Sequence, residues 1–160
     1  MDKLEQNMRF RTFLRNHADS DELDTHFLRL HDELFSTFDC CKCSNCCKEL
    51  DIFIGDDEIK AASEFLDIVK DDFINKYIMQ ADEGYMIKGN PCCFLNADGR
   101  CQIQERKPSE CIDFPFTNKP ERLYSLLSVI EFSEICPVVA EIIERLKKIY
   151  NFRDKHSAVL

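Results

Sequence analysis

Residues 39–50 of the chain read DCCKCSNCCKEL, and the interpretation of the fold starts from this stretch. Two residues separate Cys40 from Cys43 and Cys43 from Cys46, and Cys47 follows directly. Such gaps let a turning backbone direct successive sulfur atoms at one ion or cluster. The stretch therefore predicts metal ligation by cysteine thiolates.

The remaining cysteines extend this prediction. Ten of the 160 residues are cysteine, a density that indicates disulfides in a small secreted domain but metal or redox chemistry in a reducing compartment. The cysteines outside the stretch lie beside turns, prolines or the expected ends of elements, and they are Cys92, Cys93, Cys101, Cys111 and Cys136. Thiolates are soft ligands and select zinc, iron–sulfur clusters or Cu(I) over magnesium and calcium. We therefore favour metal ligation over disulfides.

The charge and hydropathy of the chain limit its compartment and its partners. The opening residues 1–24 are charged throughout and contain no apolar signal segment, and no later stretch is long and apolar enough for a membrane span. A net charge of −9, from 30 acidic and 21 basic residues, disfavours binding to nucleic acid or to an anionic membrane. We expect a cytoplasmic protein without a nucleic-acid or membrane partner.

Apolar residues at helical spacing predict helices at both ends of the chain. The first two cover residues 4–14 and 21–38. The last begins at Pro137, because proline is tolerated in the first turn of a helix. Two shorter helices are expected after Gly55 and over residues 71–79.

The middle of the chain is expected to be rich in loops, with short strands. Residues 50–54 and 85–87 have the character of strands, and the turn at Asn96–Gly99 predicts a small hairpin. A single helical turn is expected to carry Cys111. The apolar run 122–132 fits either a buried strand or a helix, and we interpret it as a strand.

Together these elements predict an α+β fold that is mainly helical, with amphipathic helices around a small, loop-rich, cysteine-lined β region. No internal repeat or Pro/Gly-rich linker divides the chain, so a single domain over residues 1–160 is expected. Within it we expect N-terminal helices over 1–38, a cysteine-cluster metal-binding core over 40–136 and a C-terminal helix over 137–152.

Several short motifs resemble a known family. Besides the first cysteine stretch they are PCCFL at 91–95, GRCQI at 99–103, PSEC at 108–111 and FP at 114–115. In this order they are similar to the CxxCxxCC family of YkgJ-like cysteine-cluster proteins, whose domains are associated with zinc or iron chelation. The resemblance implies eight ligand thiolates, which are Cys40, Cys43, Cys46, Cys47, Cys92, Cys101, Cys111 and Cys136. It leaves Cys41 and Cys93 outside the ligand set.

The function expected from these cysteines is that of a cytosolic metal-binding protein that holds an iron–sulfur cluster, zinc or both. The run Cys40-x2-Cys43-x2-Cys46 also resembles the ferredoxin run, and Cys136 precedes a proline as the fourth ferredoxin cysteine does, so we favour a cluster. Eight thiolates exceed the four that one tetrahedral zinc or one cubane cluster needs. Two sites, or one site with spare thiols, are therefore expected.

Two other functions are alternatives. The family includes larger proteins that resemble flagellin lysine methylases, so a cluster-dependent redox or group-transfer enzyme is one alternative. The other is a metal carrier or a thiol-redox sensor, in which paired cysteines exchange metal or form transient disulfides. The four glycines form no phosphate-binding loop, so nucleotide binding is not supported.

Overall fold

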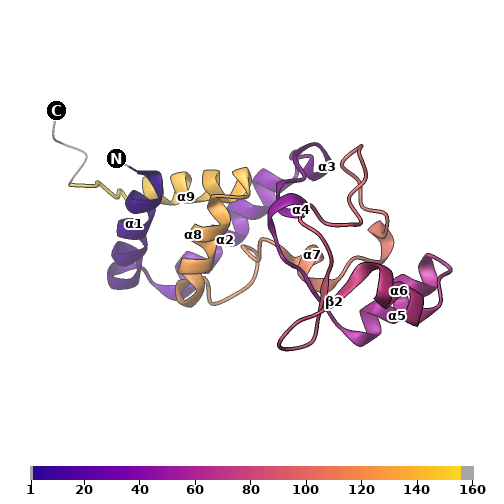
Figure 1. Cartoon of the computed structure of the whole chain (residues 1–160). Helices are drawn as coiled ribbons and strands as arrows, with labels where there is room; N and C mark the ends of the chain where they lie inside the picture. Colours follow the sequence, from indigo (N-terminus) through magenta and orange to yellow (C-terminus); the bar gives the residue numbers. More distant parts are fainter. Residues whose placement is uncertain (1, 156–160) are drawn as a thin grey trace. The chain divides into compact units, whose positions relative to one another are not determined.

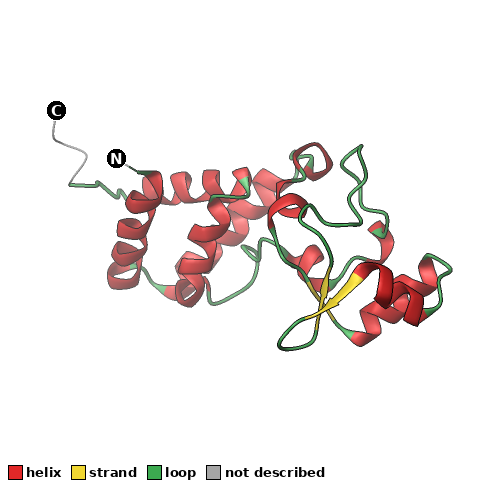
Figure 2. Cartoon of the chain, viewed as in Figure 1, coloured by secondary structure: helices red, strands yellow, loops and turns green. Residues whose placement is uncertain are grey.

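The structure, a computed structural model, describes residues 2–155 in two compact units. Of the described residues, the first unit combines 2–38 with 115–155, and the second is the continuous segment Asp39–Phe114. Figure 1 and Figure 2 show helices in both units and strands in the second. The fold is α+β and mainly helical, which confirms the expected class. Among the described residues, no helix is long and apolar enough to cross a membrane.

The first unit begins with two long helices, α1 over Lys3–His17 and α2 over Ser20–Phe35. Each follows an aspartate whose carboxylate accepts backbone N–H groups of the first turn, Asp2 for α1 and Asp19 for α2. These caps satisfy donors that the helix itself leaves unpaired. Both predicted N-terminal helices are confirmed.

The prediction of a strand over residues 122–132 is wrong. Arg122–Ser125 form a 3₁₀ turn, η2, and Leu126–Ser133 form the helix α8. The buried apolar side chains of α8 are spaced at i, i+3 and i+4, whereas Leu127 between them is 44% exposed. A short, dense apolar run fits both the helical period and the strand period of apolar residues. Packing of one face of this segment on neighbouring helices selects the helix.

Helix α9 covers Pro137–Ile149 and has proline at its first position, as the sequence predicts. It packs against α2 and α8, and α8 also packs against α1. Since full burial of a large apolar side chain contributes about 1.5–3 kcal/mol, apolar packing holds this unit together. Its largest fully buried side chains are Leu14, Leu23, Phe27, Leu30, Val129, Val139, Ile142 and Leu146.

The second unit opens with two short helices that carry the first five cysteines. They are α3 over Cys40–Cys43 and α4 over Asn45–Glu49. The Asp39 carboxylate accepts two backbone N–H groups at the start of α3. Ser44 separates the two helices with a left-handed backbone, at φ 52°. The cysteine stretch is therefore two helical turns joined by a sharp change of direction.

A small antiparallel sheet follows, with strand order β1-β3-β2 (Figure 2). Strand β1 covers Phe53–Ile54, β2 covers Ile78–Gln80 and β3 covers Tyr85–Ile87. The isoleucine of each strand is buried in the core of the unit. The predicted strand at 85–87 is confirmed. Of the predicted strand 50–54 only Phe53–Ile54 form a strand, although the carbonyl oxygen of Ile52 also accepts the amide of Ile87 over 2.9 Å.

Two helices and one aromatic cluster complete the core of the second unit. Helix α5 covers Asp56–Phe65 and packs against α6, which covers Lys70–Tyr77 and leads directly into β2. Both confirm predicted helices. The rings of Phe73 and Phe94 stack with their centroids 5.9 Å apart, and Tyr77 lies 4.7 Å from Phe94. Phe94 thereby anchors the loop after β3 to the helices.

The remaining chain of this unit forms the predicted hairpin and two helical turns. Leu95 pairs with Cys101 in an antiparallel bridge around the expected turn. The 3₁₀ turn η1 covers Gln104–Arg106, and the helix α7 covers Ser109–Asp113. Helix α7 carries Cys111, as expected from the sequence.

Candidate metal centre

One small cavity in the second unit, of about 60 Å³, gathers five of the eight predicted ligands. The thiols on its wall are Cys46, Cys47, Cys92, Cys101 and Cys111. Apolar side chains and Lys107 form the rest of the wall. Thiols from α4, from the hairpin region and from α7 therefore share one cavity from which most polar groups are excluded.

Backbone hydrogen bonds bring the separate segments together at this cavity. The amide of Cys92 donates to the carbonyl oxygen of Cys47 over 2.8 Å. On the hairpin, the amide of Gln102 donates to the carbonyl oxygen of Phe94 over 2.8 Å, next to the bridge between Leu95 and Cys101. Cys47, Cys92 and Cys101 are thus positioned by main-chain pairing rather than by their side chains.

Close contact between Gly99 and Cys41 fixes the turn of the hairpin against α3. Gly99 has φ +84°, and a Cβ atom built on it would lie 1.9 Å from the carbonyl oxygen of Cys41. The hydroxyl of Ser44 donates to that carbonyl over 2.9 Å and contacts the Gly99 carbonyl at 3.2 Å. Only glycine fits here, because any side chain would displace the helix that begins the cysteine stretch.

Glu58 positions the helix that carries Cys111. One oxygen of its carboxylate accepts the amide of Ser109 over 2.7 Å, and the other accepts the amide of Gly55 over 2.8 Å. Burial acts to raise the pKa of Glu58, but these accepted hydrogen bonds outweigh it and leave the pKa lowered. A glutamate in a first turn suggests a capping role from sequence, but its second partner, 51 residues away, has no local signal.

The thiols at the cavity act on one another electrostatically. Burial raises the pKa of Cys111 to about 12, and the charges of Cys92, Cys47 and Cys101 act in the same direction. Burial also raises the pKa of Cys101, with the charges of Cys92 and Cys47 adding to it. Because the charges of Cys47 and Cys92 disfavour the thiolates of Cys101 and Cys111, a bound cation would favour the ionisation of all four thiols.

Two cavity cysteines have a pKa that is lowered by the cysteine beside them in the chain. The Cys46 thiol donates to Cys47, which lowers the pKa of Cys47 and raises the pKa of Cys46. The Cys93 thiol, whose Sγ atom lies 3.9 Å from the carbonyl oxygen of Tyr77, also lowers the pKa of Cys92. Cys93, which the family pattern leaves outside the ligand set, therefore supports a thiolate at the cavity wall.

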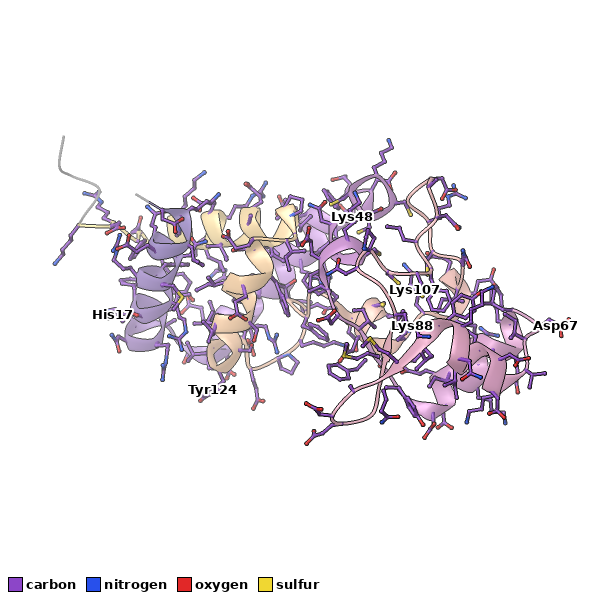
Figure 3. The ribbon with its side chains drawn as sticks, viewed as in Figure 1. His17, Lys48, Asp67, Lys88, Lys107 and Tyr124 are labelled. Atoms are coloured by element: carbon purple, nitrogen blue, oxygen red, sulfur yellow. The ribbon has the colours of Figure 1, made fainter. Side chains whose placement is uncertain are left out.

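Two lysines add positive charge near the cavity. Lys107 lies on its wall and Lys48 follows Cys47 in the chain, and Figure 3 labels both. Their charges lower the pKa of Cys47, in addition to the larger effect of the Cys46 hydrogen bond. Lys107 also favours the thiolates of Cys101 and Cys111. The sequence places Lys107 directly before Pro108, at the start of the helical turn that is expected to carry Cys111.

The other predicted ligands do not line the cavity. Cys40 is exposed and Cys43 is half-buried on α3, and the charge of Cys40 acts weakly on the pKa of Cys46. Cys136 is buried at the start of α9 and belongs to the first unit. Within residues 2–155, no three His, Cys, Asp or Glu side chains are arranged so that they could hold a metal ion as they stand.

A comparison with protein families identifies this arrangement of cysteines. The family model CxxCxxCC, described as a putative zinc- or iron-chelating domain, matches residues 39–137. The chain belongs to the CxxCxxCC family. No curated protein and no solved structure matches the chain.

The CxxCxxCC match covers the whole second unit and continues into the first. It begins at Asp39, the cap of α3, and ends at Pro137, the first residue of α9. All eight predicted ligand cysteines therefore lie inside the CxxCxxCC domain. The donor set at the cavity fits a metal of the kind named in the family description, since thiolates are ligands of both zinc and iron–sulfur clusters.

Proposed function

We propose that this protein binds metal at the cavity through the thiolates of Cys47, Cys92, Cys101 and Cys111, and that the bound group is an iron–sulfur cluster. The observation that supports this most directly is the shared cavity, which is lined by thiols from three separated segments. Family membership supports zinc or iron chelation in general. The choice of four thiolates and of a cluster is our proposal.

Electrostatic effects link these four thiols to one another. Cys111 is affected by the charges of the three others, and Cys101 by two of them. Such an assembly of like charges in an apolar cavity favours a bound cation, because the metal compensates the thiolates and displaces their protons.

The cavity favours a cluster over a single zinc ion. A water molecule needs about 10–15 Å³ of such space, so a cavity of about 60 Å³ holds several atoms between the thiols. The apolar wall excludes water, which tunes the chemistry of a bound metal. An iron–sulfur cluster would supply one-electron transfer, and the protein would supply its thiolate ligands and its dry surroundings.

Zinc is the second candidate, because four thiolates are also a complete ligand set for a structural zinc site. We place either centre in the cytoplasm, where thiols stay reduced and available to metal. Cys40, Cys43 and Cys46 remain proposed ligands of a second site or spare thiols of the first, and Cys136, in the first unit, remains a proposed ligand.

Purification without oxygen, followed by metal and sulfide analysis and a visible spectrum, tests this proposal. We expect iron with a comparable amount of acid-labile sulfide and a coloured protein. A colourless protein with stoichiometric zinc would support the zinc alternative. A folded protein that contains neither metal would contradict metal binding at this cavity.

A further inference from the structure

Lys107 has a distinctive place on the wall of the cavity. It is half-buried and is the only residue of the described wall that carries a positive charge. The chain contains 30 acidic residues, yet within the described part of the chain Lys107 forms no ion pair with a carboxylate. Lys107 therefore adds a positive charge, unpaired with any carboxylate of the described residues, to a wall that is otherwise apolar and lined with thiols.

The sequence around Lys107 explains how it reaches this wall. It lies between the turn η1 and the buried Pro108, and Cys111 follows on α7. Two other lysines in the region point their ammonium groups elsewhere. The Nζ atom of Lys48 lies 3.5 Å from the carbonyl oxygen of Cys43, and the Nζ atom of Lys88 donates to the carbonyl oxygen of Asn75. Figure 3 labels all three.

We propose that Lys107 is the counter-cation of the metal centre. This inference rests on the proposed function. Four thiolates around a divalent ion, or around an oxidised cubane cluster, leave an excess of two negative charges in an apolar wall. The ammonium group of Lys107 compensates part of this excess, so it strengthens metal binding. In a cluster it also stabilises the reduced state, which carries one more negative charge.

Lys107 acts on the charge of the centre and is not itself a ligand, because a protonated ammonium group has no free lone pair. The position of Lys107 supports this role, since it lies on the same cavity wall as Cys47, Cys101 and Cys111. Lys48 is exposed, and solvent screens its charge more strongly. Its contribution to the centre is therefore the smaller one.

The test replaces the charge of Lys107 while keeping the length of the side chain. Lys107→Met and Lys107→Gln remove the charge, Lys107→Arg keeps it, and Lys60→Met removes the charge of an exposed lysine on α5 that is not on the cavity wall. Each protein is prepared without oxygen, and far-UV circular dichroism verifies its fold. Metal affinity is measured by competition with a chelator, and the reduction potential by titration where a cluster is bound.

We expect both neutral variants at position 107 to bind metal at least about tenfold more weakly, in the range typical of lost groups around a ligand shell. The potential of a cluster should become more negative in them. Lys107→Arg and Lys60→Met should match the wild type. If Lys107→Met and Lys107→Gln bound metal with the affinity and the reduction potential of the wild type, this inference alone would be overturned. An equal loss of metal affinity in Lys60→Met would also overturn it. A wild-type protein without any metal would instead overturn the proposed function, and this inference with it.

Discussion

The backbone amide of Cys92 donates a hydrogen bond of 2.8 Å to the carbonyl oxygen of Cys47. This bond joins α4 to the loop after β3, and both cysteines line the same cavity. Main-chain pairing of this kind holds two thiols near each other before any metal is bound, so binding does not have to order these two segments.

Replacement of Cys111 by serine should remove metal from the protein, whereas Cys41→Ser should retain nearly the wild-type amount. Serine offers a harder and far less acidic hydroxyl group where the centre needs a thiolate. Cys41 is not on the cavity wall. Metal per chain, measured on both variants after identical anaerobic preparation, checks this. Equal losses in the two variants would show that the cavity does not identify the ligands.

Gly99→Ala should destabilise the second unit more than Gly84→Ala does. Both glycines have a positive φ, which costs about 1–2 kcal/mol for alanine. Only at Gly99 would the added Cβ also collide with backbone, the carbonyl of Cys41. We expect an additional cost of at least about 1 kcal/mol in the free energy of unfolding. Urea unfolding of the two variants measures this difference, and equal costs would contradict the contact with α3.

Glu58→Gln should destabilise the protein at neutral pH and have little effect at acidic pH. The pKa of Glu58 is lowered from its ordinary value of 4.5, because its carboxylate accepts the amides of Gly55 and Ser109. A lowered pKa means that the stabilisation is present above the ordinary value and is lost as the pH falls through the folded value. Chemical unfolding of both proteins as a function of pH gives the comparison.

Glu64→Gln provides the control for that measurement, since Glu64 is exposed on the same helix. This variant should match the wild type at every pH. A difference between wild type and Glu58→Gln that persists undiminished in acid would rule out the carboxylate as its cause.

Removal of the metal with a chelator should affect the second unit locally and leave the first unit folded. The buried apolar side chains of α1, α2, α8 and α9 form a core of their own. We expect the amides of residues 89–115 to lose protection in hydrogen exchange, while those of the four helices keep it. Simultaneous loss of protection throughout the chain would mean that the metal supports the whole fold.

Local sequence signals were sufficient for most of the helices. Pro137 marks the start of α9, and the aspartates before α1 and α2 cap them, because these preferences act within one helical turn. The apolar run 122–132 favours a strand from sequence, since its apolar residues are too dense to show a period, but Leu126–Ser133 form a helix. Its packing against α9 and α1 decides its structure, and that contact has no local signal.

The candidate site was predictable in its chemistry but not in its geometry. The spacing of the cysteines indicated soft-metal ligation, and the family match agrees with it. Backbone pairing between distant segments brings three of the thiols to one cavity, those of Cys47, Cys92 and Cys101. Folding alone brings Ser109 to Glu58 and the thiols of Cys47 and Cys101 to Lys107, so these relationships have no local signal in the sequence.

The ligand shell of the metal tests the central claim most directly. X-ray absorption at the metal edge, on protein prepared without oxygen, reports the identity, number and distance of the atoms bound to the metal. For the wild type we predict a shell of sulfur alone, with four sulfur atoms per metal at about 2.3 Å. In Cys111→Ser we predict that the metal loses one protein sulfur or that the whole centre is lost. A shell that contains nitrogen or oxygen in place of sulfur, or a wild-type spectrum preserved in Cys111→Ser, would contradict the proposed centre.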